Sequence, residues 1–144
     1  VKVVDYLISL EEECGLYDKK SYDNFAKRIS DLKIELNELL LSLKHKKKKI
    51  VGYGAAAKGN VLTNFFGIGT EILDYIVDST PYKQGLYTPG KHIPVYPENR
   101  LLLDMPDYAL ILAWNFSDEI IAKQSIYRKK GGKFIIPIPK VKIV

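Results

Sequence analysis

Gly52-Tyr53-Gly54-Ala55-Ala56-Ala57-Lys58-Gly59-Asn60 is a G-x-G-x-x-A pattern that directly follows a short apolar segment. When a strand leads through a tight turn into a helix, this pattern is typical of Rossmann-like nucleotide-binding folds. Gly52 is expected to permit the tight turn, Gly54 to let a ligand approach the backbone, and Ala57 to let the helix pack closely on the strand. Unpaired N–H groups at the helix start, together with Lys58, would attract an anion. The alternative stays open that small residues merely fit a tight corner.

Short apolar segments alternate with helical patterns in the residues around this turn. We expect strands at residues 50–53, 73–77, 108–113 and 134–136, and helices at residues 58–66 and 116–130. The resulting order, β-α-β, a long loop and β-α-β, predicts an α/β fold with a Rossmann-like, doubly wound, mainly parallel sheet. Ligands of such sheets bind beyond the carboxyl ends of the strands.

Residues 1–48 are predicted to form an N-terminal helical segment, and residues 49–144 the Rossmann-like domain. A short first helix is expected to stop at Gly15, and Ser21 is expected to cap a longer second helix. An apolar stripe follows the helical repeat along the second helix: Phe25, Ile29, Leu32, Leu36, Leu39 and Leu43. We expect this segment to pack on the domain or on a neighbouring domain. Because the sole methionine is Met105, we also expect further sequence upstream.

The composition, 47% hydrophobic and 27% charged residues in 144, suits a cytoplasmic α/β protein. No apolar run approaches the ~20 residues of a membrane-spanning helix, so no membrane partner is expected. Cys14, His45 and His92 show no ligand spacing typical of zinc, and we expect no metal site. The net charge of +5 owes much to lysines at positions 44 and 46–49. We interpret this run as the end of a helix, with no nucleic-acid partner.

Asp78 ends the second predicted strand, where a dinucleotide-binding fold places an acid that binds ribose hydroxyls. This position would indicate NAD. Ser79, Thr80 and Pro81 follow, so Asp78 could equally shape the turn, and both interpretations stay open.

The connection at residues 82–96 is long and rich in hydrogen-bonding side chains. Lys83 and Lys91 would suit a phosphate, Gln84 sugar hydroxyls, and Tyr87 or Tyr96 the face of a base. A surface loop stiffened by proline and glycine is the alternative.

Trp114 and Asn115 follow the third predicted strand and are therefore expected in the same ligand crevice. Asn115 would equally cap the next helix. The sequence contains no nucleophile elbow, paired catalytic acids or phosphate-transfer loop, so we expect no catalytic residue in this chain.

Three segments in this order resemble the C-terminal domain of the sugar C-methyltransferase family: GYGAAAKGN at 52–60, VDSTPYKQGLYTPGKHIPVYP at 77–97, and ILAWNF at 111–116 with GGKFIIPIP at 131–139. The resemblance covers nearly the whole chain, although the first forty-odd residues match as a pattern of helices. It implies a three-part enzyme with an N-terminal zinc-binding region and a central S-adenosylmethionine-binding domain, both upstream of this chain. A nucleotide-linked sugar, commonly a thymidine-diphosphate (dTDP) 4-keto-6-deoxysugar, is then expected in the cleft beside the central domain, which carries the general base.

The resemblance therefore implies a substrate-binding domain that binds no cofactor itself. The candidate substrate-binding residues are Gly52, Tyr53, Gly54, Ala55, Ala56, Ala57, Lys58, Gly59, Asn60, Asp78, Lys83, Gln84, Gly85, Tyr87, Pro89, Gly90, Trp114 and Asn115. An NAD(P)-binding module of an oxidoreductase remains the alternative function.

Overall fold

The computed structural model describes residues 2–144, so Val1, the first residue of the expected helical segment, lies outside the described residues. The chain divides into two compact units, Val1–Ile34 and Glu35–Val144. The first unit contains helix α1 (Lys2–Glu13) and the beginning of α2 (Lys19–His45). The chain leaves α1 through Gly15, as expected, with a left-handed φ of +68°. The expected Ser21 cap is wrong, because α2 begins two residues earlier and Ser21 lies in its first turn.

The second unit is built on a six-stranded sheet, which confirms the expected α/β, Rossmann-like, mainly parallel fold. Its strands are β1 (Ile50–Tyr53), β2 (Ile76–Asp78), β3 (Val95–Pro97), β4 (Tyr108–Ile111), β5 (Lys133–Ile136) and β6 (Lys142–Ile143). They lie in the order β3-β2-β1-β4-β5-β6, with parallel pairs throughout except for β6, which is antiparallel to β5. The strand order reverses between β1 and β4, and ligands of doubly wound sheets bind at this switch point.

Short helices connect the strands: α3 (Ala57–Phe66), η1 (Pro81–Lys83), α4 (Arg100–Asp104), η2 (Trp114–Phe116), α5 (Ser117–Lys123) and α6 (Ser125–Lys129). The expected single helix at residues 116–130 is wrong, because it is divided between α5 and α6 at Gln124. The long loop of the prediction contains β3 and α4, and β6 was also not predicted.

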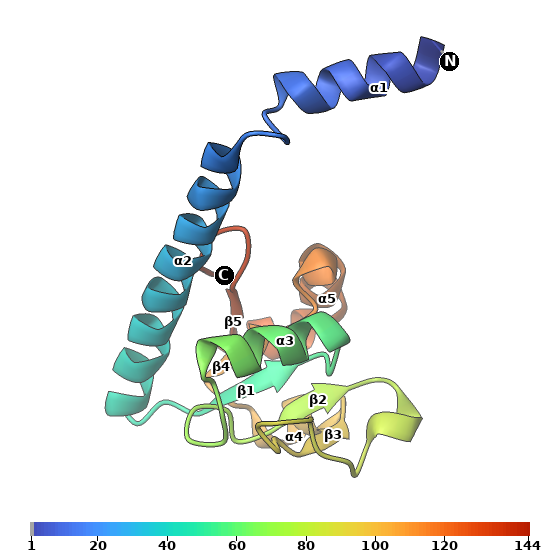
Figure 1. Ribbon diagram of the computed structural model, residues 1–144. Coiled ribbons are helices and arrows are strands. Elements are labelled where there is room, and N and C mark those ends of the chain that lie inside the picture. The colour runs from blue at the N-terminus through green and yellow to red at the C-terminus, as the bar shows by residue number, and fades with distance from the viewer. Residues whose placement is uncertain (1) are drawn as a thin grey trace. The chain divides into compact units, whose positions relative to one another are not determined.

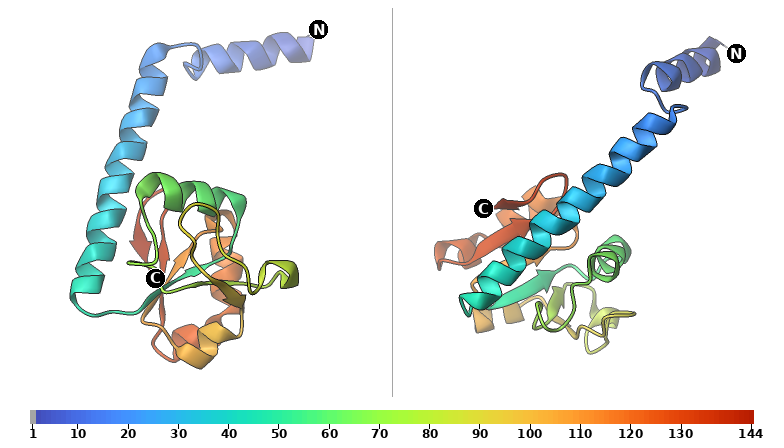
Figure 2. Two further views of the ribbon diagram at one scale, coloured as in Figure 1. Left: turned by 60° about the horizontal axis from the view of Figure 1, so that its bottom comes forward. Right: turned by 60° about the vertical axis from the view of Figure 1, so that its left-hand side comes forward.

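Alternate residues of each strand face opposite sides of the sheet. On one side, strand residues pack with helices α4, α5 and α6 in a core that contains Val51, Tyr53, Tyr75, Val77, Leu101, Ala109, Ile111, Ile120, Tyr127 and Phe134. On the other side, Gly59 of α3 lies against Leu112, which directly follows β4. Helices α3 and α4 therefore cover opposite faces of the sheet (Figures 1 and 2).

The last part of α2 belongs to the second unit. Its buried side chains are Leu36, Leu40 and Leu43, and burial of each stabilises the fold by about 1.5–3 kcal/mol. The helix ends at His45 within the lysine run, as expected. Lys44 and Lys48 of this run form ion pairs with acids of the same unit, at 3.3 Å from Asp74 and 2.8 Å from Asp107.

Candidate functional site

The turn between β1 and α3 lies at the carboxyl edge of the sheet. Gly54 has a φ of +90°, and a Cβ at this position would stand 2.9 Å from the Cβ of Ala113 after β4. The close approach of these two segments of the chain and the left-handed backbone both require glycine here. Ala56 precedes α3 without a side-chain cap, so the first N–H groups of this helix are left for another acceptor.

The expected roles of two other small residues in this turn are wrong. Gly52 lies inside β1 without a positive φ, and an added Cβ would stand 2.7 Å from Cγ1 of Ile76. It therefore permits close packing on the sheet face rather than the turn. Ala57 is exposed, and Gly59 is the residue that brings α3 close to the sheet, since its Cβ would stand 2.6 Å from the Cβ of Leu112.

Asp78 at the end of β2 holds this turn in place. Its carboxylate accepts hydrogen bonds from the backbone N–H of Ala55 at 2.7 Å and of Thr80 at 2.8 Å, and Lys83 Nζ lies 3.4 Å away. Burial raises the pKa of Asp78, but the hydrogen bonds from Thr80 and Ala55 and the charge of Lys83 outweigh it, so that the pKa lies below its ordinary value. The carboxylate is thus engaged by the protein's own backbone.

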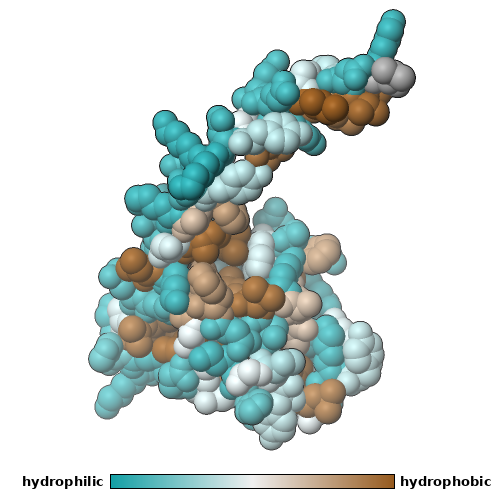
Figure 3. All heavy atoms as spheres, in the orientation of Figure 1, coloured by the Kyte–Doolittle hydropathy of each residue, from teal (hydrophilic) through white to brown (hydrophobic). Residues whose placement is uncertain are grey.

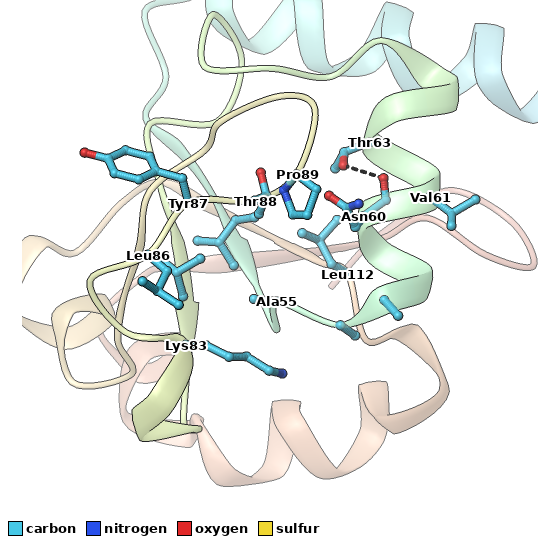
Figure 4. A pocket seen from close by; sticks show the side chains of 14 residues that line it. Ala55, Asn60, Val61, Thr63, Lys83, Leu86, Tyr87, Thr88, Pro89 and Leu112 are labelled. Carbon is cyan, nitrogen blue, oxygen red and sulfur yellow. Dashed lines mark hydrogen bonds between the residues drawn. The ribbon is translucent and has the colours of Figure 1, made fainter.

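A pocket of about 460 Å³ lies between α3, the residues after η1 and the sheet (Figure 4). Its walls are mostly apolar, and Figure 4 shows Lys83 extending into the space between η1 and α3, while Asn60 lies on the α3 side. The lining residues are Ala55, Ala56, Ala57, Asn60, Val61, Thr63, Ile76, Lys83, Leu86, Tyr87, Thr88, Pro89, Val95 and Leu112. Apolar walls with a few polar groups are typical of small-molecule sites.

A second, more polar pocket of about 310 Å³ lies on the other side of the turn. It is lined by Tyr53, Gly54, Ala56, Asp78, Ser79, Thr80, Lys83, Ala113, Phe116, Glu119, Ile120 and Lys123. Ala56 and Lys83 line both pockets, so the turn and one ammonium group separate the two hollows. A ligand with an apolar part and an anionic part would find both environments within reach of Lys83.

The loop after η1 is ordered by its own hydrogen bonds. Gln84 donates from Nε2 to the carbonyl oxygen of Asp78 at 2.9 Å, so this amide secures the loop. The buried Thr88 accepts the Ile93 N–H at 3.0 Å, and Asn64 of α3 donates to the carbonyl oxygen of Pro89 at 3.1 Å. These bonds fix the wall of the larger pocket to α3.

Several predicted site residues line neither of these two pockets. They are Gly52, Lys58, Gly59, Gln84, Gly85, Gly90, Trp114 and Asn115. Lys58 Nζ lies over the ring of Trp114, 4.9 Å from its centroid, and 5.5 Å from that of Phe116. The expected helix cap by Asn115 is wrong, because this residue lies within η2 and Phe116 precedes α5 without a side-chain cap bond.

A hydrogen-bonded network beside the smaller pocket was not predicted. Tyr53 donates its hydroxyl to Glu98, Gln124 donates to the same Glu98 oxygen at 2.8 Å, and Lys123 lies 2.7 Å from the other. Burial and then the hydrogen bond to Glu98 raise the pKa of Tyr53 well above its usual range. Burial raises the pKa of Glu98, but the bonds from Lys123 and Tyr53 lower it below its ordinary value. No sequence motif marks this network, because its members are distant along the chain.

Neither a metal-binding cluster nor a membrane-spanning helix is present within residues 2–144. In that range, no group of three or more His, Cys, Asp or Glu side chains is arranged to hold a metal ion. None of the helices there has both the length and the apolar character needed to cross a bilayer.

The sequence is similar to those of known C-methyltransferases. Residues 1–139 match the family model described as C-methyltransferase C-terminal domain. The chain is also 33% identical, over 138 residues, to C-methyltransferase NovU of Streptomyces niveus. This similarity covers 96% of the present chain but 33% of that protein, so the chain spans about a third of the length of the curated relative it matches.

Proposed function

This chain belongs to the family of C-methyltransferase C-terminal domains, and from that premise we propose that it binds the substrate of an S-adenosylmethionine-dependent C-methyltransferase. The substrate is a nucleotide-linked keto-deoxysugar, with dTDP as the nucleotide. S-adenosylmethionine, zinc and the general base belong to preceding domains of the same cytoplasmic protein.

The main support for this proposal is that the two pockets share Lys83. The larger, apolar pocket suits the flat base and the sugar ring, because apolar walls favour faces that carry few charges. Lys83 and the uncapped start of α3 supply positive potential for the diphosphate. The candidates Ala55, Ala56 and Asn60 lie where these groups would meet.

A binding role rather than a catalytic one fits the ionisable groups of the larger pocket. Lys83 and Tyr87 are the titratable residues that line it, and Lys83 is paired with Asp78. Asp78 is held by backbone N–H groups, which keep its carboxylate ionised but occupied. Neither Lys83 nor Asp78 is therefore poised to take a proton from a carbon atom of the substrate.

The geometry of Asp78 also speaks against the alternative, an NAD(P)-binding oxidoreductase module. A dinucleotide-binding fold needs the acid at the end of β2 to accept hydrogen bonds from ribose hydroxyls. In this chain, both carboxylate oxygens already accept backbone hydrogen bonds, and the residue is 7% exposed.

Calorimetric titration with thymidine diphosphate, and separately with NAD, tests the proposal. We expect binding of the diphosphate and a loss of about 10- to 100-fold in affinity in Lys83→Ala, as for one charge-assisted hydrogen bond of about 1.5–3 kcal/mol. Lys91→Ala is the matched control, because Lys91 lines neither pocket and should leave the affinity unchanged. Equal affinities of the two variants, or tighter binding of NAD than of the diphosphate, would contradict the proposal.

The same pair of variants applies to the full-length enzyme. There, Lys83→Ala should raise the KM for the nucleotide sugar, while Lys91→Ala should not. An unchanged KM in both variants would mean that this domain only supports its neighbour.

A further inference from the structure

Helix α1 (Lys2–Glu13) carries an apolar face on which no side chain is fully buried. At helical spacing, Val3, Val4, Leu7 and Leu10 lie on one side, with Leu7 at its centre. No side chain of the helix is buried: Val3, Val4 and Leu7 are exposed, Leu7 to 52%, and Leu10 is half-buried. Figure 3 shows hydrophobic side chains gathered along one side of α1 and hydrophilic ones along the other. We refer to the residues Val3, Val4, Leu7 and Leu10 as the α1 apolar face.

Such a face is costly for an isolated helix. A helix of 12 residues is at the lower limit of stability in water unless its apolar side packs on another element. Contiguous exposed apolar side chains on a soluble protein mark an interaction surface. The α1 apolar face therefore requires a partner.

We propose that the partner is the domain that precedes this chain in the full-length C-methyltransferase, an inference that rests on the proposed function. The matched relative extends well beyond the similar region, because the match covers 33% of that protein's length. Because the matched family model describes a C-terminal domain, the remainder of such a protein lies on the N-terminal side, next to α1. Docking would then be intramolecular and would proceed at a high effective concentration.

The charges of α1 favour this partner over a second copy of the same helix. Lys2 stands at the start of α1, whereas Asp5, Glu11, Glu12 and Glu13 make the helix acidic. Two copies side by side would bring unbalanced carboxylates together in either orientation. The docking surface of the preceding domain is therefore expected to be apolar with a basic rim.

Hydrogen exchange of the α1 backbone, compared between residues 1–144 alone and the full-length protein, tests this docking. We expect exchange at least about tenfold slower in the full-length protein, because docking must open before the amides exchange. Leu7→Glu places a charge at the centre of the α1 apolar face and should abolish this protection. Ser9→Glu adds the same charge on the opposite side of the helix and should leave it intact.

Three outcomes would overturn the proposal. In the first, α1 exchanges equally fast in both proteins. In the second, Leu7→Glu and Ser9→Glu behave alike. In the third, residues 1–144 alone form a concentration-dependent dimer in sedimentation that Leu7→Glu dissociates, which would identify a second copy as the occupant. Thymidine-diphosphate binding, measured on the same samples, separates a failure of the docking from a failure of the proposed function.

Discussion

Replacement of Asp78 by asparagine tests the central contact of the site. The carboxylate accepts hydrogen bonds from Ala55 N–H at 2.7 Å and Thr80 N–H at 2.8 Å, and it pairs with Lys83 at 3.4 Å. Asparagine keeps one oxygen, so one of the two N–H groups would face an NH₂ group instead. One lost hydrogen bond to a charged acceptor costs about 1.5–3 kcal/mol. The pair with the partly exposed Lys83 adds at most about 1 kcal/mol.

Asp78→Asn should therefore lower the free energy of unfolding by about 1.5–4 kcal/mol in urea titrations at pH 7. Asp74→Asn is the control, because Asp74 forms one exposed pair with Lys44 and its loss should cost at most about 1 kcal/mol. If both variants lose the same stability, the assignment of Asp78 as the residue that holds the turn is refuted.

The pH dependence of the Asp78→Asn effect provides a second check. The pKa of Asp78 in the folded chain lies below its ordinary value of 3.8. A group with a lowered pKa stabilises the fold above its unfolded pKa, and this contribution is lost as the pH falls through the folded pKa. The difference between wild type and Asp78→Asn should therefore be full near neutral pH and shrink below pH 3.8. A difference that grows on acidification would contradict the ionised, hydrogen-bonded state.

Three further changes in unfolding free energy follow from close contacts of the second unit. Gly54→Ala should lower the free energy of unfolding by about 1–3 kcal/mol more than Gly85→Ala does. Both glycines have a positive φ, but an added methyl group meets Ala113 only at Gly54. Equal losses in urea titrations would contradict this close contact. Gly59→Ala should lower the melting temperature, because overpacking against Leu112 costs about 1–3 kcal/mol and the gain in helix propensity is about 1 kcal/mol. A more stable variant would show that α3 can shift away from Leu112. Tyr53→Phe should cost about 1–2 kcal/mol, because it removes the hydrogen bonds of the hydroxyl with Glu98 and Gln124. Tyr17→Phe, at an exposed tyrosine, should cost less than about 0.5 kcal/mol, and similar values for the two variants would show that the network does not stabilise the fold.

The turn between β1 and α3 was predictable because its signals are adjacent in the chain. An apolar strand, small residues and a helical pattern follow one another within residues 50–66, and the structure has β1 and α3 there. Strand β3 gave no such signal, because it is three residues long and ends in Pro97. Its extended form depends on pairing with β2, in which Val95 lies beside Ile76.

The sequence by itself determined the class of fold and the edge of the sheet where the candidate site lies, because local hydrophobic period and turn residues specify strands, helices and their order. The tertiary structure alone decided what each side chain does there. It turned the carboxylate of Asp78 onto the backbone of Ala55, directed Lys58 over Trp114, and placed Lys83 between two pockets. These outcomes depend on distances between residues far apart in the chain, which are set when the sheet packs against its helices and which no local pattern records.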